Sequence, residues 1–281
     1  MFVLRLKGIK RTFSQAPIDY VKVRKEDIKR PNLKKGTYRQ FNSGNSTITE
    51  INAYAEQNRL VIFCHGGAFI SGPVLHHWNA AKRMGKQLKA KVWLVDYPKA
   101  PEHSIRVMSH EIDKVYELAQ EKYAANQIIL IGDSVGGTLI TALVQRLIFK
   151  GKQLPEKLVL ISPVMEAAMV NEEIAEIEPL DPMLGIAGVK SAKEMAALNG
   201  NLTDPIISPL NGRFKGFPPT LLCIADHDIT MPDQWRAADK MKAANVKLTI
   251  IKGDNMPHIW PILPVLAEGK KAFAEMIKWM K

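Results

Sequence analysis

The sequence predicts an α/β protein built on a mostly parallel, doubly wound sheet, and three observations support that prediction. Short continuous apolar runs recur along the chain, stretches compatible with helices separate them, and few gaps are long. Apolar runs without alternation are typical of strands that are buried on both faces, as in a parallel sheet covered by helices. A chain of 281 residues is long enough for one large domain of this kind.

The expected elements follow one another in a regular order. Residues 38–42 and 47–53 read as two strands of a hairpin, joined by a Ser-Gly-Asn turn. Six apolar runs complete a sheet of about eight strands, at residues 60–64, 92–97, 128–131, 158–161, 221–224 and 248–251. Helices are expected at residues 79–88, 109–123, 138–149, 233–244 and 267–280. Ligands bind beyond the carboxyl ends of such strands, and residues 165–205, rich in Glu and Met, are expected to cross that edge.

The excess positive charge is confined to the first part of the chain. Residues 1–40 hold twelve Lys/Arg and three Asp/Glu, whereas the rest of the chain holds 27 basic and 25 acidic side chains. The net charge of +11 therefore does not indicate a nucleic-acid-binding domain. Phe2, Leu6, Ile9 and Phe13 recur at helical spacing beside basic residues. Such a helix could lie on anionic lipid or an acidic partner, but packing of its apolar face on the main domain is the favoured interpretation.

Cysteine usage indicates a reducing compartment, and hydropathy indicates no membrane-spanning segment. Cys64 and Cys223 each lie inside an apolar run, which favours buried free thiols over a disulfide. Apolar stretches stay short of a membrane span, and charged residues interrupt the N-terminus too early for a signal-peptide core. We therefore expect a cytoplasmic protein with no integral membrane association and no nucleic-acid partner.

The run IILIGDSVGG, residues 128–137, places a serine at the turn between a strand and a helix. Its glycines permit a sharp, strained turn that lifts the Ser134 hydroxyl off the sheet, beside the N–H of Val135. This pattern predicts nucleophilic serine chemistry, which also needs a base, an acid and oxyanion donors. A tightly packed glycine-rich turn or a phosphate-binding turn would show the same short pattern.

Candidates for those partners follow other strands. His258 comes after the last strand, where the base is expected; the remaining histidines are at positions 65, 76, 77, 103, 110 and 227. Asp226 and Asp228, in the segment CIADHD, could each orient the imidazole, and spacing alone does not choose between them. Oxyanion donors are expected from HGGAF, residues 65–69, which directly follows a strand.

Several motifs together resemble the hormone-sensitive-lipase-like family of α/β-hydrolases, bacterial esterases especially. HGGAF is similar to the family's HGGG-F/W motif, DYPKAPEH (residues 96–103) to DYRLAPEH, and GDSVGG to GDSAGG. LDPML and DPIISPL (204–210) resemble the stretch that lines the family's pocket, and the resemblance spans roughly residues 60–261. It implies an α/β-hydrolase fold with a small helical cap. Residues 1–35 would then form an N-terminal cap segment and residues 36–281 the catalytic domain, of which residues 165–205 contribute to the cap and pocket.

The resemblance also implies a role for each candidate. Ser134 is the expected nucleophile and His258 the base, while Asp228, three residues after the position matched by Ala225, is the expected acid. The N–H groups expected to form the oxyanion hole are those of Gly67, Ala68 and Val135. Apolar residues near the motifs are expected to line the substrate pocket: Phe69, Trp78, Met183, Leu184, Met256 and Trp260.

Two positions depart from the family pattern. Ala68 stands where the family has a third glycine, so its Cβ needs tolerable backbone angles and narrows the acyl side of the pocket. Pro98 and Lys99 stand where the family has Arg-Leu, which leaves the structural role of that arginine unassigned.

The resemblance thus predicts a serine carboxylesterase that hydrolyses short-chain carboxylic esters through an acyl-enzyme intermediate, without a cofactor or metal. Its expected partner is a small-molecule ester, and a homodimer is left open. A lactone hydrolase or an acyltransferase would use the same triad. A serine peptidase would share it too, although the chain lacks a propeller-sized extra domain. A non-catalytic receptor of this family would have lost the histidine, which His258 argues against.

Overall fold

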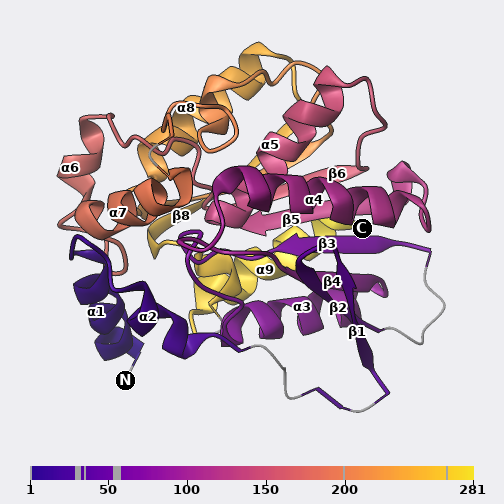
Figure 1. Cartoon of the computed structure of the whole chain (residues 1–281), viewed down its shortest axis with the longest axis horizontal. Helices are drawn as coiled ribbons and strands as arrows, with labels where there is room; N and C mark the ends of the chain where they lie inside the picture. The colour runs from indigo at the N-terminus through magenta and orange to yellow at the C-terminus, as the bar shows by residue number, and fades with distance from the viewer. Residues whose placement is uncertain (1, 29–32, 35, 53–57, 199, 264) are drawn as a thin grey trace.

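Among the described residues, eight strands form one central sheet in the order β1-β2-β4-β3-β5-β6-β7-β8 (Figure 1). The structure is a computed structural model that describes residues 2–28, 33–34, 36–52, 58–198, 200–263 and 265–281, with side chains from Gly8 onward. The strands are β1 Tyr38–Ser43, β2 Ser46–Ile51, β3 Leu60–Cys64, β4 Lys91–Asp96, β5 Ile128–Asp133, β6 Lys157–Ile161, β7 Thr220–His227 and β8 Leu248–Pro257.

Strand pairing confirms the predicted fold class. β1 and β2 form the antiparallel hairpin, and β2 pairs antiparallel with β4. From β4 through β3, β5, β6 and β7 to β8, every pairing is parallel. The predicted second strand ended at residue 53, which lies outside the described residues.

Helices cover both faces of the sheet (Figure 1). One face packs on α4 (Ile105–Gln120), α5 (Val135–Phe149) and α8 (Met231–Ala243), and the other on α3 (Leu75–Leu88) and α9 (Ala267–Met280). Alternate residues of β3 enter the two cores, since Leu60 and Ile62 face the first and Val61 and Phe63 the second. This double burial explains why the strands read as unbroken apolar runs.

Element ends differ from the predicted ones by a few residues. α9 matches its prediction, whereas α3 and α4 begin four residues before theirs. The Ser104 hydroxyl caps α4 by accepting from Val107 N–H at 3.4 Å. Caps and turns, not apolar spacing, set these starts. β7 and β8 likewise run past their apolar parts, to His227 and Pro257.

Further helices of the described chain gather at one side of the sheet, at the left in Figure 1. They are α1 (Phe2–Phe13), α2 (Tyr20–Val23), α6 (Glu173–Ile177) and α7 (Ile186–Ala197), and short 3-10 turns lie at Arg24–Glu26, Ala125–Gln127, Pro209–Asn211 and Trp260–Ile262. Ile9 and Phe13 pack against the core, and Lys10 Nζ donates to Glu178 O at 2.8 Å and to Leu184 O. The described part of α1 therefore packs on the protein, in line with the favoured interpretation.

None of the described helices is both long enough and apolar enough to cross a membrane.

Candidate active site

Ser134 occupies the turn between β5 and α5 in a strained conformation. Its φ of 52° and ψ of −125° lie in a region that costs a non-glycine residue about 1–3 kcal/mol. Its N–H donates to Ile161 O at 2.9 Å and its carbonyl accepts from Val164 N–H at 3.1 Å, so β6 and the segment after it hold the turn. A Cβ on Gly136 would overlap Cys64 O, which explains the glycine two residues after the serine.

His258 and Asp228 are joined at the carboxyl ends of β8 and β7. His258 Nδ1 lies 2.8 Å from Asp228 Oδ2, and the two side chains are 4% and 0% exposed. Asp228 also accepts from the N–H and the hydroxyl of Thr230, at 2.9 and 2.7 Å. Asp226 instead accepts from Met256 N–H at 3.2 Å. Of the two aspartates that spacing left open, the structure brings Asp228 to the histidine.

This contact shifts the pKa of both partners. Burial lowers the pKa of His258, but the charge and hydrogen bond of Asp228, with Asp181 and Asp133 farther away, outweigh burial and raise it above its usual value. Burial raises the pKa of Asp228, and the charge and hydrogen bond of His258, with the bonds from Thr230, outweigh burial and lower it. The Asp228 carboxylate therefore stabilises the imidazolium form of His258 relative to that of an isolated histidine.

A second buried carboxylate stands beside this pair, and sequence reasoning missed it. Asp181 accepts from the N–H groups of Met183, Leu184 and Ile229 at 2.7, 2.8 and 2.9 Å. Burial, with the charge of Asp228, raises its pKa to about 6. It links residues 183–184 to the residue after Asp228. The LDPML motif was the signal for it, although the motif was read only as pocket lining.

Ser134 and His258 share one cavity of about 760 Å³. Within the described part of the chain, no hydrogen bond joins the Ser134 hydroxyl to His258. Such contacts are often long without substrate and tighten when it binds. Around the two residues, the wall comes from the loop after β3, from the N-terminal helices and from α7, with Gly67, Ala68, Val135, Ile9, Phe13, Met183, Leu184, Val189 and Lys193 among its residues.

The loop after β3, residues 65–72 and here called the glycine loop, has an unusual backbone. Gly67 has a φ of 125°, and Ala68 and Phe69 have φ values of 54° and 65°. A Cβ on Gly67 would overlap Ser71 O, whereas Ala68 occupies the left-handed region at a cost of roughly 1–2 kcal/mol. Among the described residues, the N–H groups of Gly67, Ala68 and Val135 have no hydrogen-bond acceptor, and all three residues line the cavity.

Residues at the ends of two strands, β5 and β4, hydrogen-bond to the start of the glycine loop. Asp133 Oδ1 accepts from Gly66 N–H at 3.0 Å, which ties the loop to the residue before Ser134. Tyr97, at the end of β4, stacks on the His65 ring at 4.6 Å and donates its hydroxyl proton to His65 O at 2.8 Å. The two strands on either side of β3 therefore position the loop relative to Ser134.

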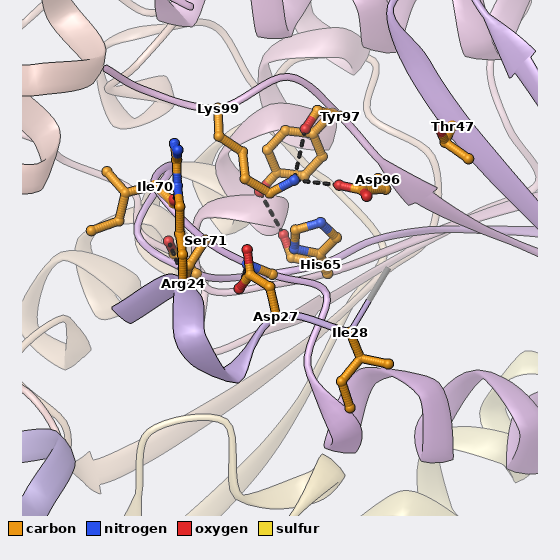
Figure 2. Close-up of polar contacts among 12 residues, drawn as sticks. Arg24, Asp27, Ile28, Thr47, His65, Ile70, Ser71, Asp96, Tyr97 and Lys99 are labelled. Atoms are coloured by element: carbon orange, nitrogen blue, oxygen red, sulfur yellow. Dashed lines mark hydrogen bonds and ion pairs between the residues drawn. The ribbon is translucent and has the colours of Figure 1, made fainter. Parts of the chain in front are cut away.

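The N-terminal segment holds the other end of the loop, as Figure 2 shows for Arg24 and Asp27. Arg24 donates to Ile70 O at 2.7 Å and to Ala100 O at 2.6 Å, and it pairs with Glu102 at 2.7 Å. Asp27 Oδ1 accepts from Gly72 N–H at 2.6 Å. Arg24 thus joins the glycine loop to the segment in which the family pattern has its arginine.

Lys99 has a different set of contacts in that segment. Its ammonium donates to Tyr97 O at 3.0 Å and pairs with Asp96 (Figure 2), and the residue is only 7% exposed. Lys99 therefore stabilises the end of β4, whereas among the described residues it is Arg24 that donates to Ile70 O and Ala100 O.

The expected pocket residues separate into two groups. Met183 and Leu184 line the cavity, whereas Phe69, Trp78, Met256 and Trp260 are absent from its described wall. The three aromatic side chains are at most 4% exposed and belong to the cores on the two faces of the sheet. Trp78 Nε1, for example, donates to Ile28 O at 2.9 Å. For these four residues the expectation was wrong, because closeness in sequence to a motif does not decide where a side chain points.

His76, His77 and Asp133 form a cluster whose ligand atoms lie within 4.8 Å of one another. His77 Nε2 is 3.1 Å from His76 Nε2 and 3.3 Å from Asp133 Oδ2. However, His77 Nδ1 accepts from Val74 N–H at 3.0 Å, so in the neutral ring the proton is on Nε2. A ligating histidine usually has the opposite arrangement, with the other ring N–H donating outward. The cluster therefore fits a hydrogen-bonded network better than a metal centre.

Comparison with known proteins gives a consistent set of relatives. A family model described as alpha/beta hydrolase fold matches residues 61–262. An esterase of Acinetobacter venetianus is 31% identical over 201 residues, which cover 71% of this chain and 66% of that protein. Esterase LipU of Mycobacterium tuberculosis is 30% identical over 211 residues, which cover 72% of this chain and 68% of that protein. The chain thus spans about two thirds of the length of these curated relatives.

Solved structures show the same architecture. A putative esterase from Staphylococcus aureus superposes with a TM-score of 0.86 at 26% identity, over 93% of this chain and 89% of that one. An esterase/lipase from an uncultured bacterium superposes with a TM-score of 0.85 at 22% identity, over 99% and 97% of the two chains.

Proposed function

Since the chain belongs to the α/β-hydrolase fold family, we propose that it is a serine carboxylesterase acting on short-chain carboxylic esters through an acyl-enzyme intermediate. The observation that supports this most directly is the 2.8 Å contact of Asp228 with His258, which lines the same cavity as Ser134. In this proposal Ser134 is the nucleophile, His258 the base and Asp228 the acid.

Acylation begins when the Ser134 hydroxyl attacks the ester carbonyl carbon and His258 Nε2 takes its proton. Asp228 accepts the Nδ1 proton, which keeps the ring in the tautomer with a free Nε2 and stabilises the imidazolium that forms. The tetrahedral oxyanion accepts hydrogen bonds from the N–H groups of Gly67, Ala68 and Val135. Each such donor stabilises the transition state by about 3–4 kcal/mol. When the intermediate collapses, His258 gives the proton to the leaving alcohol and the acyl group stays on Ser134.

Deacylation repeats the sequence with water. His258 removes a proton from a water molecule that attacks the acyl carbon, and the same N–H groups hold the second oxyanion. Collapse returns the proton to Ser134 and releases the carboxylic acid. No other group is required for the proton balance.

Hydrolysis of p-nitrophenyl esters from acetate to palmitate tests the proposal. We expect cleavage that is fastest for the short chains, and a fall of at least about 10⁴-fold for Ser134→Ala. Asp228→Asn should lose about 10⁴-fold in kcat because the imidazole loses its orienting acceptor. Asp226→Asn is the matched control and should stay within a few-fold of the wild type. Absence of cleavage by the wild type, or greater loss in the Asp226 variant, would contradict the assignment.

The domain organisation and the cellular location of the protein follow the same expectations. We propose that residues 1–35 and 165–205 form a cap over a catalytic domain of residues 36–281. The presence of Ile9, Phe13 and Val189 in the cavity wall supports this division, although the boundary at residue 35 lies outside the described residues.

The expected buried free thiols are confirmed, and they support a cytoplasmic location. We propose a small-molecule ester as the substrate, with no nucleic-acid partner; a homodimer would be tested by light scattering.

A further inference from the structure

The residue that follows the proposed base has a strained backbone. Ile259 has a φ of 54°, in the left-handed region. A β-branched residue stays in that region only where its surroundings hold it there. Ile259 is 5% exposed and lines the same cavity as Ser134 and His258. Strained residues cluster at functional sites, so the contact that holds Ile259 bears on the position of His258.

That contact comes from Ser162, the residue directly after β6. The Ser162 hydroxyl oxygen accepts from Ile259 N–H at 3.1 Å. Ser162 is itself strained, with a φ of 43°, and it is 0% exposed. Its own N–H donates to Cys223 O at 2.9 Å, which fixes it to β7. One hydrogen bond therefore joins two strained, buried residues that are 97 positions apart in the chain.

The segment around Ser162 also holds the proposed nucleophile. Ser134 N–H donates to Ile161 O at 2.9 Å, and Ser134 O accepts from Val164 N–H at 3.1 Å. Residues 161–164 thus contact the Ser134 turn through their backbone and the residue after His258 through the Ser162 side chain. Because these contacts leave from four consecutive residues, the segment fixes where the two turns lie relative to each other.

The chain before His258 is held as well. Pro257, the last residue of β8, pairs with His227 of β7 in the sheet. Asp228 contacts the imidazole at Nδ1, at 2.8 Å. That contact fixes the ring at one point, so the place that Nε2 takes also depends on the backbone. Pro257 fixes the backbone before the histidine, and the Ser162 hydroxyl fixes the backbone after it.

We propose that Ser162 is a positioning residue whose hydroxyl, by holding Ile259 N–H, sets the distance between the Ser134 hydroxyl and His258 Nε2. The inference rests on the proposed esterase function and deepens it. Ser162 is absent from the described cavity wall and exchanges no proton in this role. Without the hydroxyl, the buried Ile259 N–H loses its acceptor, and Ile259 can leave the left-handed region and carry His258 away from Ser134. A displacement of about 1 Å at a reacting group can lower a rate about 100-fold.

The test measures kcat and KM of Ser162→Ala on p-nitrophenyl acetate, well below the unfolding temperature of each protein. We expect kcat to fall about tenfold to 100-fold, since His258 acts in both acylation and deacylation. KM should stay within a few-fold of the wild type, because Ser162 is absent from the described cavity wall. Ser104→Ala is the matched control: its hydroxyl also accepts from a backbone N–H, that of Val107 at 3.4 Å, but it caps α4. It should lose stability and keep kcat.

Ser162→Gly separates the hydroxyl from the strain. It lacks the hydroxyl too, but glycine suits a φ of 43° better than alanine does, so it should lose less stability. We expect its kcat to fall as in Ser162→Ala. If glycine restored kcat, or if Ser104→Ala lost as much as Ser162→Ala, the loss would follow stability and the positioning role would be overturned.

The same measurements separate this inference from the proposed function. If both Ser162 variants keep kcat within about threefold of the wild type while Ser134→Ala is inactive, the positioning role is wrong and the esterase proposal stands. If the wild type cleaves no ester, both are wrong.

Discussion

At the scale of single residues, Asp181 is the side chain whose effect on the proposed mechanism is easiest to isolate. Its charge contributes to the raised pKa of His258, and its oxygens hold three backbone N–H groups around the site. It contacts neither the imidazole nor Ser134 in the described structure. Asp181 is thus a positioning residue that also tunes the base.

Replacement of Asp181 by Asn should move the acid limb of the pH profile. His258 must be neutral to accept a proton, so kcat/KM falls as the pH drops through the pKa of His258, which is raised here. Removing the Asp181 charge lowers that pKa, and we expect the limb to shift toward lower pH. Below about pH 6 the difference should shrink, because the pKa of Asp181 is about 6 and its carboxyl is then protonated in the wild type too.

Asp233→Asn is the matched control for that measurement. Asp233 is also buried, and burial raises the pKa of its carboxyl too, but it pairs with Arg236 and is not among the groups that shift His258. A limb that moves equally in both variants, or in neither, would contradict the role assigned to Asp181.

At the scale of elements, the glycine loop depends on contacts that come from far away in the sequence. Arg24→Met keeps the apolar stem and removes the donors to Ile70 O and Ala100 O. We expect a fall of about 1–3 kcal/mol in the free energy of unfolding, and about tenfold in kcat/KM as the loop loses its alignment. Denaturant unfolding and ester kinetics measure the two effects.

Glu102→Gln separates the loop contacts from the ion pair. The Arg24 and Glu102 side chains are 26% and 51% exposed, so their pair contributes little in water. We expect Glu102→Gln to change stability by less than about 1 kcal/mol and to leave catalysis near the wild-type level. If Glu102→Gln were as damaging as Arg24→Met, the ion pair and not the loop contacts would be responsible.

Most strands and helices could be predicted from the sequence, but the exact start of some helices could not. The sheet, the hairpin and the helices between strands followed from apolar runs, because burial on both faces leaves a local signal in each strand. The starts of α3 and α4 did not, because caps decide them. The family resemblance was confirmed, and the contact between Asp228 and His258 agrees with the residues it implied.

The pocket was predicted least well, for a physical reason. Trp260 is two residues from His258, yet it packs beneath the loop near Gly253 and Gly269. Lys193 and Ile9 reach the cavity from segments with no motif at all. Neighbours in sequence point in different directions on a turn, and a cavity wall is assembled from distant segments. Only the tertiary structure shows which side chains from these distant segments meet at the cavity.

At the scale of the whole molecule, the two cores on either side of the sheet shield both cysteines. Cys64 in β3 and Cys223 in β7 are free and 0% exposed, and burial raises the pKa of both thiols far above the usual value. We expect no reaction of the native protein with an aromatic disulfide reagent over minutes, and reaction of both thiols after unfolding in guanidinium. A thiol that reacts in the native state would mean that one face of the sheet opens readily.

The position of His258 after the last strand has a consequence for synthesis. A growing chain carries Ser134 and the glycine loop long before the histidine emerges from the ribosome. The helix that packs beneath the histidine's loop, α9, follows later still. On the proposed mechanism, a nascent chain therefore cannot cleave an ester until residues 258–280 have been made and folded into place. Incomplete translation products would be inert toward esters.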